Sequence, residues 1–376
     1  MNLQLSEDQK LIQASVQDYF ERAQDFGVYL SQSDGSKPLH PDIWNELRDM
    51  GWLGILVPES AGGLGLGPQE LMLVMEGVGE SLLLEPLLST VICTPVLAKS
   101  TSDMARSVLE STLAGKEVLA LAWDEQDSSL VSPWALQATV ASKDCGWRLS
   151  GKKRLVADAS AATWLLVSAL DADGQKGLWL VPISAPGVNV ADVRMVDGRR
   201  HADVDFQSVA LHEGSRILSG HAAEVALQTA LYRGLAAICS QALGSMQRVL
   251  QITRTYLLER QQFGRPLADF QVLRHRIADM AMTVQRAKSM TYLAAIRADE
   301  AAHGDTNALR DLCMAKFLIG RCGREVGSQG IQLHGGMGMA LEYPVGHYYR
   351  SLLAVDAAFG SSDEHLSYLA DTLVSH

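Results

Sequence analysis

The 376-residue chain has few cysteines and no long hydrophobic run, and these two absences already exclude several protein classes. Its five cysteines are an odd number without Cys-x-x-Cys spacing, so the sequence indicates neither a disulfide framework nor a zinc site. No apolar stretch approaches the ~18 residues of a membrane span. The N-terminal MNLQLSEDQK is acidic where a signal peptide would be basic and then apolar. We therefore expect a reduced, cytoplasmic protein that does not use a membrane.

Basic residues are also fewer than acidic residues. Lysine and arginine number 32 against 43 aspartates and glutamates, which gives a formal charge of -11. A protein that binds the phosphate backbone of nucleic acid needs a basic surface, so we expect no nucleic-acid partner. Hydrophobic residues make up 47% of the chain, which is enough for large cores, and the length suggests two or three domains.

The first third of the sequence is predicted to be helical. Ser6 and Gln9 form a capping box ahead of an apolar helical stripe, whose members are Leu11, Ile12, Val16, Tyr19 and Phe20. A second helix around 44–50 ends at Gly51, and the glycine-rich GWLGILVPESAGGLGLG predicts a loop after it. Helices are expected again over 68–83 and from 86 to about 113.

From Val118 the pattern changes to short β-prone runs separated by turn signals at 143–146, 171–174 and 197–198. Helical periodicity returns over 223–260, 270–302, 306–329 and 363–374, which predicts a four-helix bundle. The expected fold class is therefore α+β. It has an N-terminal helical domain (1–117), a middle antiparallel β domain (118–218) and a C-terminal bundle domain (219–376).

One candidate binding run is ERQQFGRPLADFQ, in which Gly264 and Pro266 interrupt a helical pattern and leave Arg260 at a helix C-terminus. An arginine and an aromatic residue so placed, Arg260 and Phe263, could bind a phosphate and a flat ring. The alternative is that Arg260 only caps its helix and Phe263 belongs to the core.

A second candidate run, QGIQLHGGMGMALEYP, has Gly335, Gly336 and Gly338 directly after a helix. Such glycines let a ligand or another backbone approach closely, and Gln332 offers a hydrogen-bonding side chain. A helix cap followed by a turn is the alternative interpretation.

Together the two runs, RxxFGxxLxxxQ and QxxGGxG followed by EYP, resemble the acyl-CoA dehydrogenase family, as does VPESAGGLGLG near the N-terminus. That resemblance implies FAD as cofactor, an acyl-CoA substrate and electron-transferring flavoprotein as acceptor. In the family a glutamate takes the α-proton while the β-hydride passes to the flavin. The resemblance also implies which residues a subunit offers to the phosphate and adenosine end of FAD held mainly by its neighbour: Arg260, Gln262, Phe263, Gln271, Gln332, Gly335 and Gly336.

The departures from the family pattern are equally informative. Phe359 stands where the family usually has its glutamate base, and Gly234 stands at the alternative position on a bundle helix. The family's TEPxAGSD and W-x-T segments, which support the flavin ring, read AWDEQDSS and LVAD here. Ala122 therefore replaces a threonine, and Leu155 and Ala157 replace the tryptophan and threonine, with the acidic Asp124 nearby. Catalytic residues are thus expected to be absent from this chain.

Other carboxylates near the vacated position have a simpler explanation. Ser361 and Glu364 fit a capping box for the last helix, and Asp363 belongs to its first turn. Glu342 is an equally poor candidate base. His334 could touch ligand or be a structural histidine, and Tyr343, Tyr348 and Tyr349 are expected to pack rather than to bind a cofactor.

The chain keeps the residues that it would offer to FAD across an interface and lacks those for its own flavin ring and its own proton abstraction. In this it resembles the smaller, non-catalytic β subunit of heteromeric α2β2 acyl-CoA dehydrogenases of the steroid side-chain and pimeloyl-CoA type. The resemblance implies a related α subunit that brings the glutamate, and a bulky acyl-CoA substrate. Two alternatives stay open. One is a homomeric dehydrogenase with a relocated base such as Glu364, and the other is a flavin-free scaffold that binds acyl-CoA.

Overall fold

A computed structural model of the chain describes residues 5–23, 26–35, 39–143 and 146–374. It divides into two compact units. The helical unit comprises Met1–Leu30, Pro68–Leu83 and Leu235–His376, and the sheet unit comprises Ser31–Gly67 and Leu84–Gly234. Along the chain the order is helices, strands, helices, which confirms the predicted fold class. The two predicted boundaries between the three domains stay a prediction. No helix within the described residues is long and apolar enough to cross a membrane.

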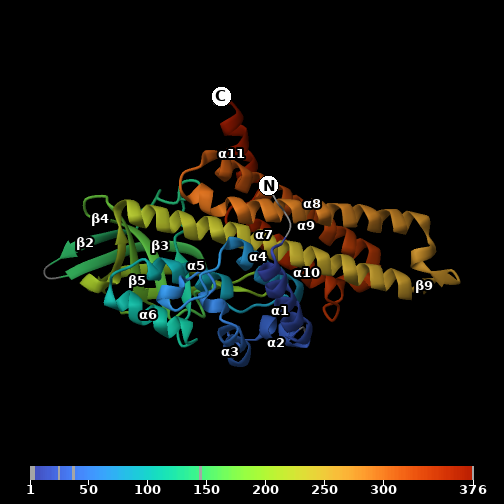
Figure 1. The fold of residues 1–376 in the computed structure, drawn as a ribbon, viewed down its shortest axis with the longest axis horizontal. Coiled ribbons are helices and arrows are strands. Elements are labelled where there is room, and N and C mark those ends of the chain that lie inside the picture. The colour runs from blue at the N-terminus through green and yellow to red at the C-terminus, as the bar shows by residue number, and fades with distance from the viewer. Residues whose placement is uncertain (1–4, 24–25, 36–38, 144–145, 375–376) are drawn as a thin grey trace. The chain divides into compact units, whose positions relative to one another are not determined.

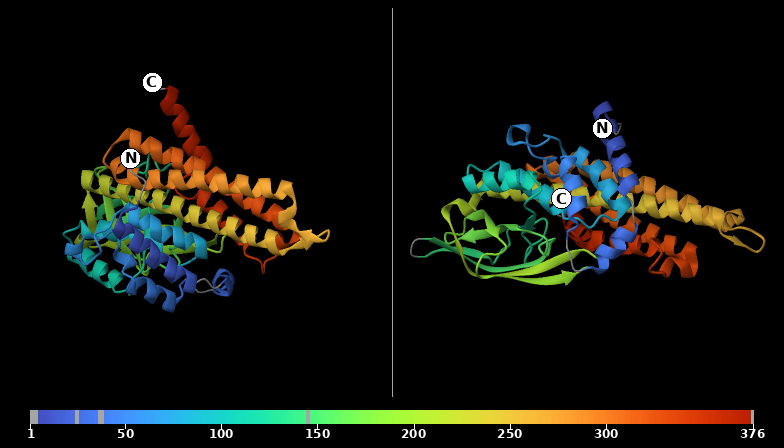
Figure 2. Two further views of the ribbon diagram at one scale, coloured as in Figure 1. Left: turned by 45° about the vertical axis from the view of Figure 1, so that its right-hand side comes forward. Right: turned by 90° about the horizontal axis from the view of Figure 1, so that it is seen from below.

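The helical unit contains three long helical segments that run side by side, namely α8, α9 and the Leu235–Glu259 part of α7 (Figure 1 and Figure 2). Helix α8 packs along α9, and α10 and α11 pack on α9 as well. The bounds are α1 Glu7–Ala23, α2 Phe26–Asp34, α4 Pro68–Ser81, α7 Gly220–Glu259, α8 Gln271–Ala302, α9 Thr306–His334, α10 Val345–Ala357 and α11 Ser362–Val374. The prediction of four C-terminal helices missed α10, because its sequence VGHYYRSLLAVDA has no side-chain cap and carries a glycine and three consecutive aromatic rings directly after its first residue, Val345.

The first helix confirms its predicted cap. The Ser6 N–H donates to Gln9 Oε1 at 3.0 Å, and the Gln9 N–H donates to Ser6 Oγ at 3.1 Å. Val16, Tyr19 and Phe20 of the predicted stripe are buried, but Leu11 is exposed, so its assignment to the buried face was wrong. The buried face is therefore narrower than the sequence indicated.

Two glycines allow α4 and α7 to touch backbone to backbone. A Cβ added to Gly79 would lie 1.9 Å from the Gln241 carbonyl oxygen, and one added to Gly244 would lie 1.9 Å from that of Glu76. The Ser245 hydroxyl donates to the Gly79 carbonyl at 3.0 Å across the same contact. Any larger residue at either glycine would force the helices apart.

The sheet unit contains one eight-stranded sheet in the order β6-β7-β3-β2-β4-β5-β8, with β1 added beside β4. Its strands are β1 Leu119–Ala122, β2 Thr139–Lys143, β3 Gly146–Ala157, β4 Trp164–Asp171, β5 Lys176–Pro182, β6 Val188–Arg194, β7 Arg200–Leu211 and β8 Arg216–Ser219. The strands on either side of all three predicted turns pair in antiparallel fashion, and residues 144–145 of the first turn lie outside the described residues. The prediction of a wholly antiparallel sheet was wrong at β4, which pairs in parallel with β1 and β2.

Helices α3 Pro41–Asp49, α5 Leu87–Ala98 and α6 Asp103–Leu113 complete the sheet unit, and α5 packs against β1. The predicted glycine-rich loop after α3 is confirmed and contains two short 3-10 turns, Trp52–Gly54 and Glu59–Ala61. A Cβ on Gly63 would meet the Val57 carbonyl oxygen at 2.2 Å, so the tight course of this loop requires glycine there.

A fully buried ion pair lies inside the sheet unit. Lys153 of β3 donates to Glu125 Oε1 at 2.6 Å, to Ser168 Oγ at 3.1 Å and to the Trp123 carbonyl at 3.3 Å, which uses all three ammonium hydrogens. The other Glu125 oxygen accepts the N–H of Gln137 at 2.6 Å. Burial lowers the pKa of Lys153 to about 8, against the opposing effect of Glu125. Each charge therefore depends on the other for its burial.

Candidate functional site

The first candidate run forms the exposed connection between α7 and α8. Helix α7 ends at Glu259, and the Arg260 N–H still donates to the Tyr256 carbonyl at 2.9 Å. Short strands β9 Gln261–Gln262 and β10 Arg265–Pro266 then pair across a tip formed by Phe263 and Gly264. Phe263 is 89% exposed, so the alternative that it is a core residue was wrong. The guanidinium of Arg260 is exposed and has no ion-pair partner in the described parts of the chain.

The second candidate run forms the end of α9. Gly335 has φ 58° and ψ −136°, a backbone conformation that other residues rarely adopt. A Cβ added to Gly335 or to Gly336 would meet nothing within 4 Å, whereas one on Gly338 would lie 2.8 Å from the Ile331 carbonyl oxygen. The space over Gly335 and Gly336 is therefore open, and Gln332 is exposed beside it.

An aromatic contact brings the two runs together. The ring of Tyr256, one turn before Arg260, lies 4.4 Å from the ring of His334, which immediately precedes Gly335 (centroid to centroid). Gln271 begins α8 at the end of the same α7–α8 connection. We call the seven exposed residues of this region the bundle-end group: Arg260, Gln262, Phe263, Gln271, Gln332, Gly335 and Gly336.

The local charge also differs from that of the whole chain. The segment from Arg254 to Arg276 contains five arginines against only Glu259 and Asp269, in a chain whose formal charge is -11. Guanidinium groups and open glycine backbone are the usual partners of phosphate oxygens in proteins. This end of the helical unit can therefore hold an anionic group.

Two family models match most of the chain. The acyl-CoA dehydrogenase N-terminal domain matches residues 6–116, and the acyl-CoA dehydrogenase C-terminal domain matches residues 223–374. The chain belongs to the acyl-CoA dehydrogenase family. Acyl-CoA dehydrogenases are FAD-dependent oxidoreductases that act on acyl-CoA thioesters, so the predicted family and cofactor are confirmed.

Individual acyl-CoA dehydrogenase relatives match over nearly the whole chain. The CarC subunit of the caffeyl-CoA reductase-Etf complex of Acetobacterium woodii is 26% identical over 358 residues, which cover 92% of each protein. A solved structure of a variant of the Tcur3481-Tcur3483 steroid ACAD is 27% identical, covers 98% of both chains and gives a TM-score of 0.85. The ChsE4-ChsE5 complex of Mycobacterium tuberculosis shares the fold at 24% identity, full coverage of both chains and a TM-score of 0.86.

Phe359, which the sequence predicts to stand at the family's usual base position, has a side chain that cannot accept a proton. Phe359 lies between α10 and α11 with φ 54°, and its carbonyl accepts a hydrogen bond from His365 Nε2 at 3.0 Å. Burial lowers the pKa of His365 to about 4, so this histidine is neutral at pH 7. The alternative position, Gly234, is buried inside α7.

Buried polar groups fix the loop that carries Phe359. Lys316 of α9 donates to the carbonyl oxygens of Asp356 at 2.7 Å and Gly360 at 2.9 Å. Arg324 pairs with Asp356 at 2.5 Å, and the Ser362 hydroxyl donates to the same carboxylate. A Cβ on Gly320 would lie 1.9 Å from Asp356 Oδ1, so the carboxylate packs directly on the α9 backbone.

The nearby carboxylate Glu364 caps a helix, as predicted. The Ser361 N–H donates to Glu364 Oε2 at 2.5 Å, and the Glu364 N–H donates to Ser361 Oγ at 3.3 Å. The bond from the Ser361 backbone lowers the pKa of Glu364, which is the wrong direction for a general base working near neutral pH. Asp363 and Glu342 are exposed.

The three tyrosines after the glycine run take part in packing, as predicted, but at three separate places. Tyr343 contacts His334, with 5.1 Å between ring centroids. The buried Tyr348 donates to the Glu80 carbonyl, and Tyr349 fills the space over Gly327. None of them is among the exposed residues of the bundle-end group.

The three residues that the sequence predicts at the family's flavin-ring positions are apolar and lie in the sheet unit. Ala122 is buried at the end of β1, and Leu155 and Ala157 are exposed on β3. The N–H of Leu155 donates to Asp203 Oδ1 at 2.8 Å. The side chains of Ala122, Leu155 and Ala157 therefore offer neither a hydrogen-bond donor nor an aromatic face.

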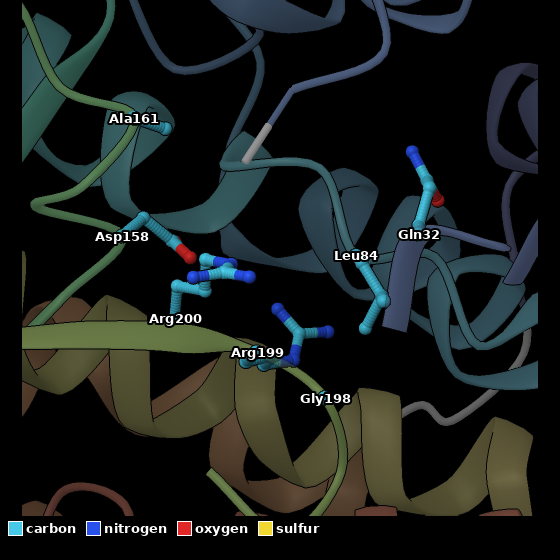
Figure 3. A pocket seen from close by; sticks show the side chains of 7 residues that line it. All are labelled: Gln32, Leu84, Asp158, Ala161, Gly198, Arg199 and Arg200. Atoms are coloured by element: carbon cyan, nitrogen blue, oxygen red, sulfur yellow. The ribbon is translucent and has the colours of Figure 1, made fainter. Parts of the chain in front are cut away.

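A pocket in the sheet unit was not predicted. It is a shallow, open hollow whose roughly 350 Å³ of space includes open solvent, and Figure 3 shows the residues that line it: Gln32, Leu84, Asp158, Ala161, Gly198, Arg199 and Arg200. Two buried carboxyls lie at it or beside it. Asp158 accepts from the Ser89 hydroxyl at 2.6 Å, and burial raises its pKa. Glu85 accepts from Gln32 Nε2 at 2.6 Å and from the His40 N–H at 3.2 Å, and burial raises its pKa to about 7. These residues are scattered along the chain, so no sequence motif indicates them.

The raised pKa of Glu85 predicts a pH-dependent stability. Because the folded state binds this proton more tightly than the unfolded chain does, the stabilisation is present below about pH 4.5 and is lost as pH rises through about 7. Glu85→Gln keeps an acceptor for Gln32 and His40 without the charge. We expect it to raise the free energy of unfolding by about 1 to 2 kcal/mol at pH 8, with little change at pH 5. Denaturant unfolding at both pH values measures this, with the exposed Glu110→Gln as control. An equal effect of Glu85→Gln at both pH values would contradict the prediction.

Proposed function

We propose that this chain is the non-catalytic β subunit of a heteromeric, FAD-dependent acyl-CoA dehydrogenase. It contributes the bundle-end group to the phosphate and adenosine end of FAD across a heterodimer interface, while a related α subunit supplies the catalytic glutamate. The observation that carries the proposal is the contrast between two regions. The bundle-end group is outward-facing and intact, whereas Phe359 and Gly234 occupy both familiar base positions.

The residues fit FAD at one end only. Arg260 and the open turn at Gly335 and Gly336 suit a pyrophosphate, because guanidinium and backbone N–H groups donate to its oxygens. Ala122, Leu155 and Ala157 do not suit the isoalloxazine ring, whose polar edge needs hydrogen-bond donors. When bound, FAD supplies the hydride acceptor, and the role of this chain is to hold and orient its distal half.

Exposed apolar side chains at the same end support an interface there. Besides Phe263, the chain segments next to the bundle-end group expose Leu258, Val272, Met337, Met339 and Leu341. Monomeric proteins rarely leave such side chains gathered in one region without a partner. The names of the relatives point in the same direction, because the Tcur3481-Tcur3483 and ChsE4-ChsE5 structures each pair two chains. We propose an α2β2 assembly on this basis.

Substrate, acceptor and location are part of the same proposal. One relative is named as a steroid ACAD, and a β subunit without its own flavin ring and base leaves room for a bulky acyl-CoA. CarC is named as part of a reductase-Etf complex, which supports electron-transferring flavoprotein as acceptor. We expect the enzyme to work in the cytoplasm.

Flavin content tests the proposal directly. We expect the isolated chain to be colourless and to bind FAD weakly or not at all, because it offers contacts to only one end of the cofactor. A tagged copy purified from its native host should instead bring along an acyl-CoA dehydrogenase chain and one FAD per pair. The measurements are flavin absorbance and mass spectrometry of the partner. Tight, stoichiometric FAD on the chain alone would overturn the proposal.

The two alternatives make different predictions in the same preparations. A homomeric dehydrogenase with Glu364 as relocated base requires Glu364→Gln to abolish turnover with flavin retained, since loss of a general base costs about 10² to 10⁴ in rate. A flavin-free scaffold requires the purified complex to contain no FAD. The proposed β subunit retains FAD in the complex and keeps kcat within a few-fold in Glu364→Gln.

A further inference from the structure

A buried histidine joins the two runs that make up the bundle-end group. His334 is 3% exposed, and its Nδ1 lies 2.8 Å from the Gly330 carbonyl oxygen. A carbonyl only accepts, so Nδ1 carries the proton and Nε2 is an unprotonated acceptor. Nε2 is buried without a partner in the described part of the molecule. The ring is therefore oriented by a single hydrogen bond and by the rings around it.

One of those rings comes from α7, four residues before Arg260, and the other from the EYP end of the run that contains His334. Tyr256 of α7 lies 4.4 Å from His334 at an interplanar angle of 31°, and Tyr343 of the EYP motif lies 5.1 Å from it at 51°. The Tyr256 carbonyl accepts the Arg260 N–H at 2.9 Å, and the backbone after His334 continues directly into Gly335. A path of one hydrogen bond and one ring contact thus connects Arg260 with the glycine turn.

We propose that His334 is a positioning residue that fixes the spacing between Arg260 and the turn at Gly335 and Gly336, and so sets the affinity for the phosphate end of FAD. This inference rests on the proposed function. The proposed phosphate site has two parts, Arg260 and the glycine turn. Ordering the two parts only when FAD binds would cost binding free energy, so a fixed spacing in the free chain raises the affinity. The ring of His334 contacts both Tyr256 of α7 and Tyr343 of the EYP segment, and the rings of Tyr256 and Tyr343 also meet edge to face with their centroids 6.5 Å apart. What matters in this role is a flat ring between Tyr256 and Tyr343.

The test compares FAD dissociation constants in the complex purified through a tag on this chain, after removal and titration of FAD. His334→Phe keeps a flat ring, and we expect its dissociation constant to stay within about threefold of wild type. His334→Ala removes the ring and should weaken FAD by about tenfold. His347 is the matched control, because it is a buried histidine of the same unit set among aromatic rings, those of Phe26 and Tyr29. His347→Ala should lower Tm as much as His334→Ala but leave FAD affinity within threefold.

Three results would overturn the inference: FAD affinity unchanged in His334→Ala, equal weakening in His347→Ala, or His334→Phe as weak as His334→Ala. If His334→Ala does not fold, Tyr256→Leu against Tyr256→Phe tests the same ring contact from the α7 side. Failure of the proposed function looks different, because the complex would then lack FAD or would retain wild-type affinity in Arg260→Ala. Weakened FAD in Arg260→Ala together with a neutral His334→Ala would remove the positioning role alone.

Discussion

Lys153→Met should lower the free energy of unfolding by about 3 to 5 kcal/mol, which is among the largest effects expected of a single side chain in this protein. Methionine fills a similar volume but leaves the Glu125 carboxylate buried without its counter-charge. The N–H groups of Gln137 and Ala138 would still donate to that carboxylate, but neither carries a positive charge. Chemical denaturation of the isolated chain measures the loss.

Two further variants decide whether the buried charge is the cause. Lys152→Met changes the neighbouring exposed lysine of the same strand and should alter stability by less than about 0.5 kcal/mol. The double variant Lys153→Met with Glu125→Gln removes both charges and should regain part of the loss. If the double variant is no more stable than Lys153→Met, packing rather than charge holds this part of the sheet unit together.

Arg260→Ala should release FAD from the heteromeric complex while the chain stays folded. A charge-assisted hydrogen bond is worth about 1.5 to 3 kcal/mol, so the dissociation constant for FAD should rise by roughly 10- to 150-fold. Arg321→Ala is the control, because Arg321 is an exposed arginine of α9 in the same unit and lies over Phe317 rather than in the bundle-end group. Unchanged FAD affinity in Arg260→Ala would mean that Arg260 only caps its helix.

Local sequence signals predicted local structure well. The capping boxes at Ser6 and Ser361 are present with both of their hydrogen bonds, and Arg260 follows the end of its helix directly. Each of these features depends on residues within four positions of one another. The side chain sets the backbone geometry there without help from the rest of the fold.

Features that depend on distant residues were missed. The parallel partners of β4 come from before it in the chain, and a hydrophobic pattern of period two does not specify strand direction. The contact of Tyr256 with His334 and Tyr343 joins α7 with the second candidate run, and nothing in the sequence of either indicates how far apart they lie in space. The pocket around Asp158 and Arg200 could not be predicted for the same reason.

In the loop that carries Phe359, the hydrogen bonds that hold the backbone path do not involve the side chain at position 359. Its course is set by Lys316, Ser362 and His365, whose hydrogen bonds go to backbone carbonyls or to the Asp356 carboxylate and do not involve the side chain of residue 359. The residue at 359 can therefore be exchanged while the loop keeps its path. The strict demands fall instead on the scaffold beneath it, at Gly320 and Asp356, where a single added carbon has no room. A change of function at this loop would therefore be made at residue 359, with Gly320 and Asp356 left unchanged.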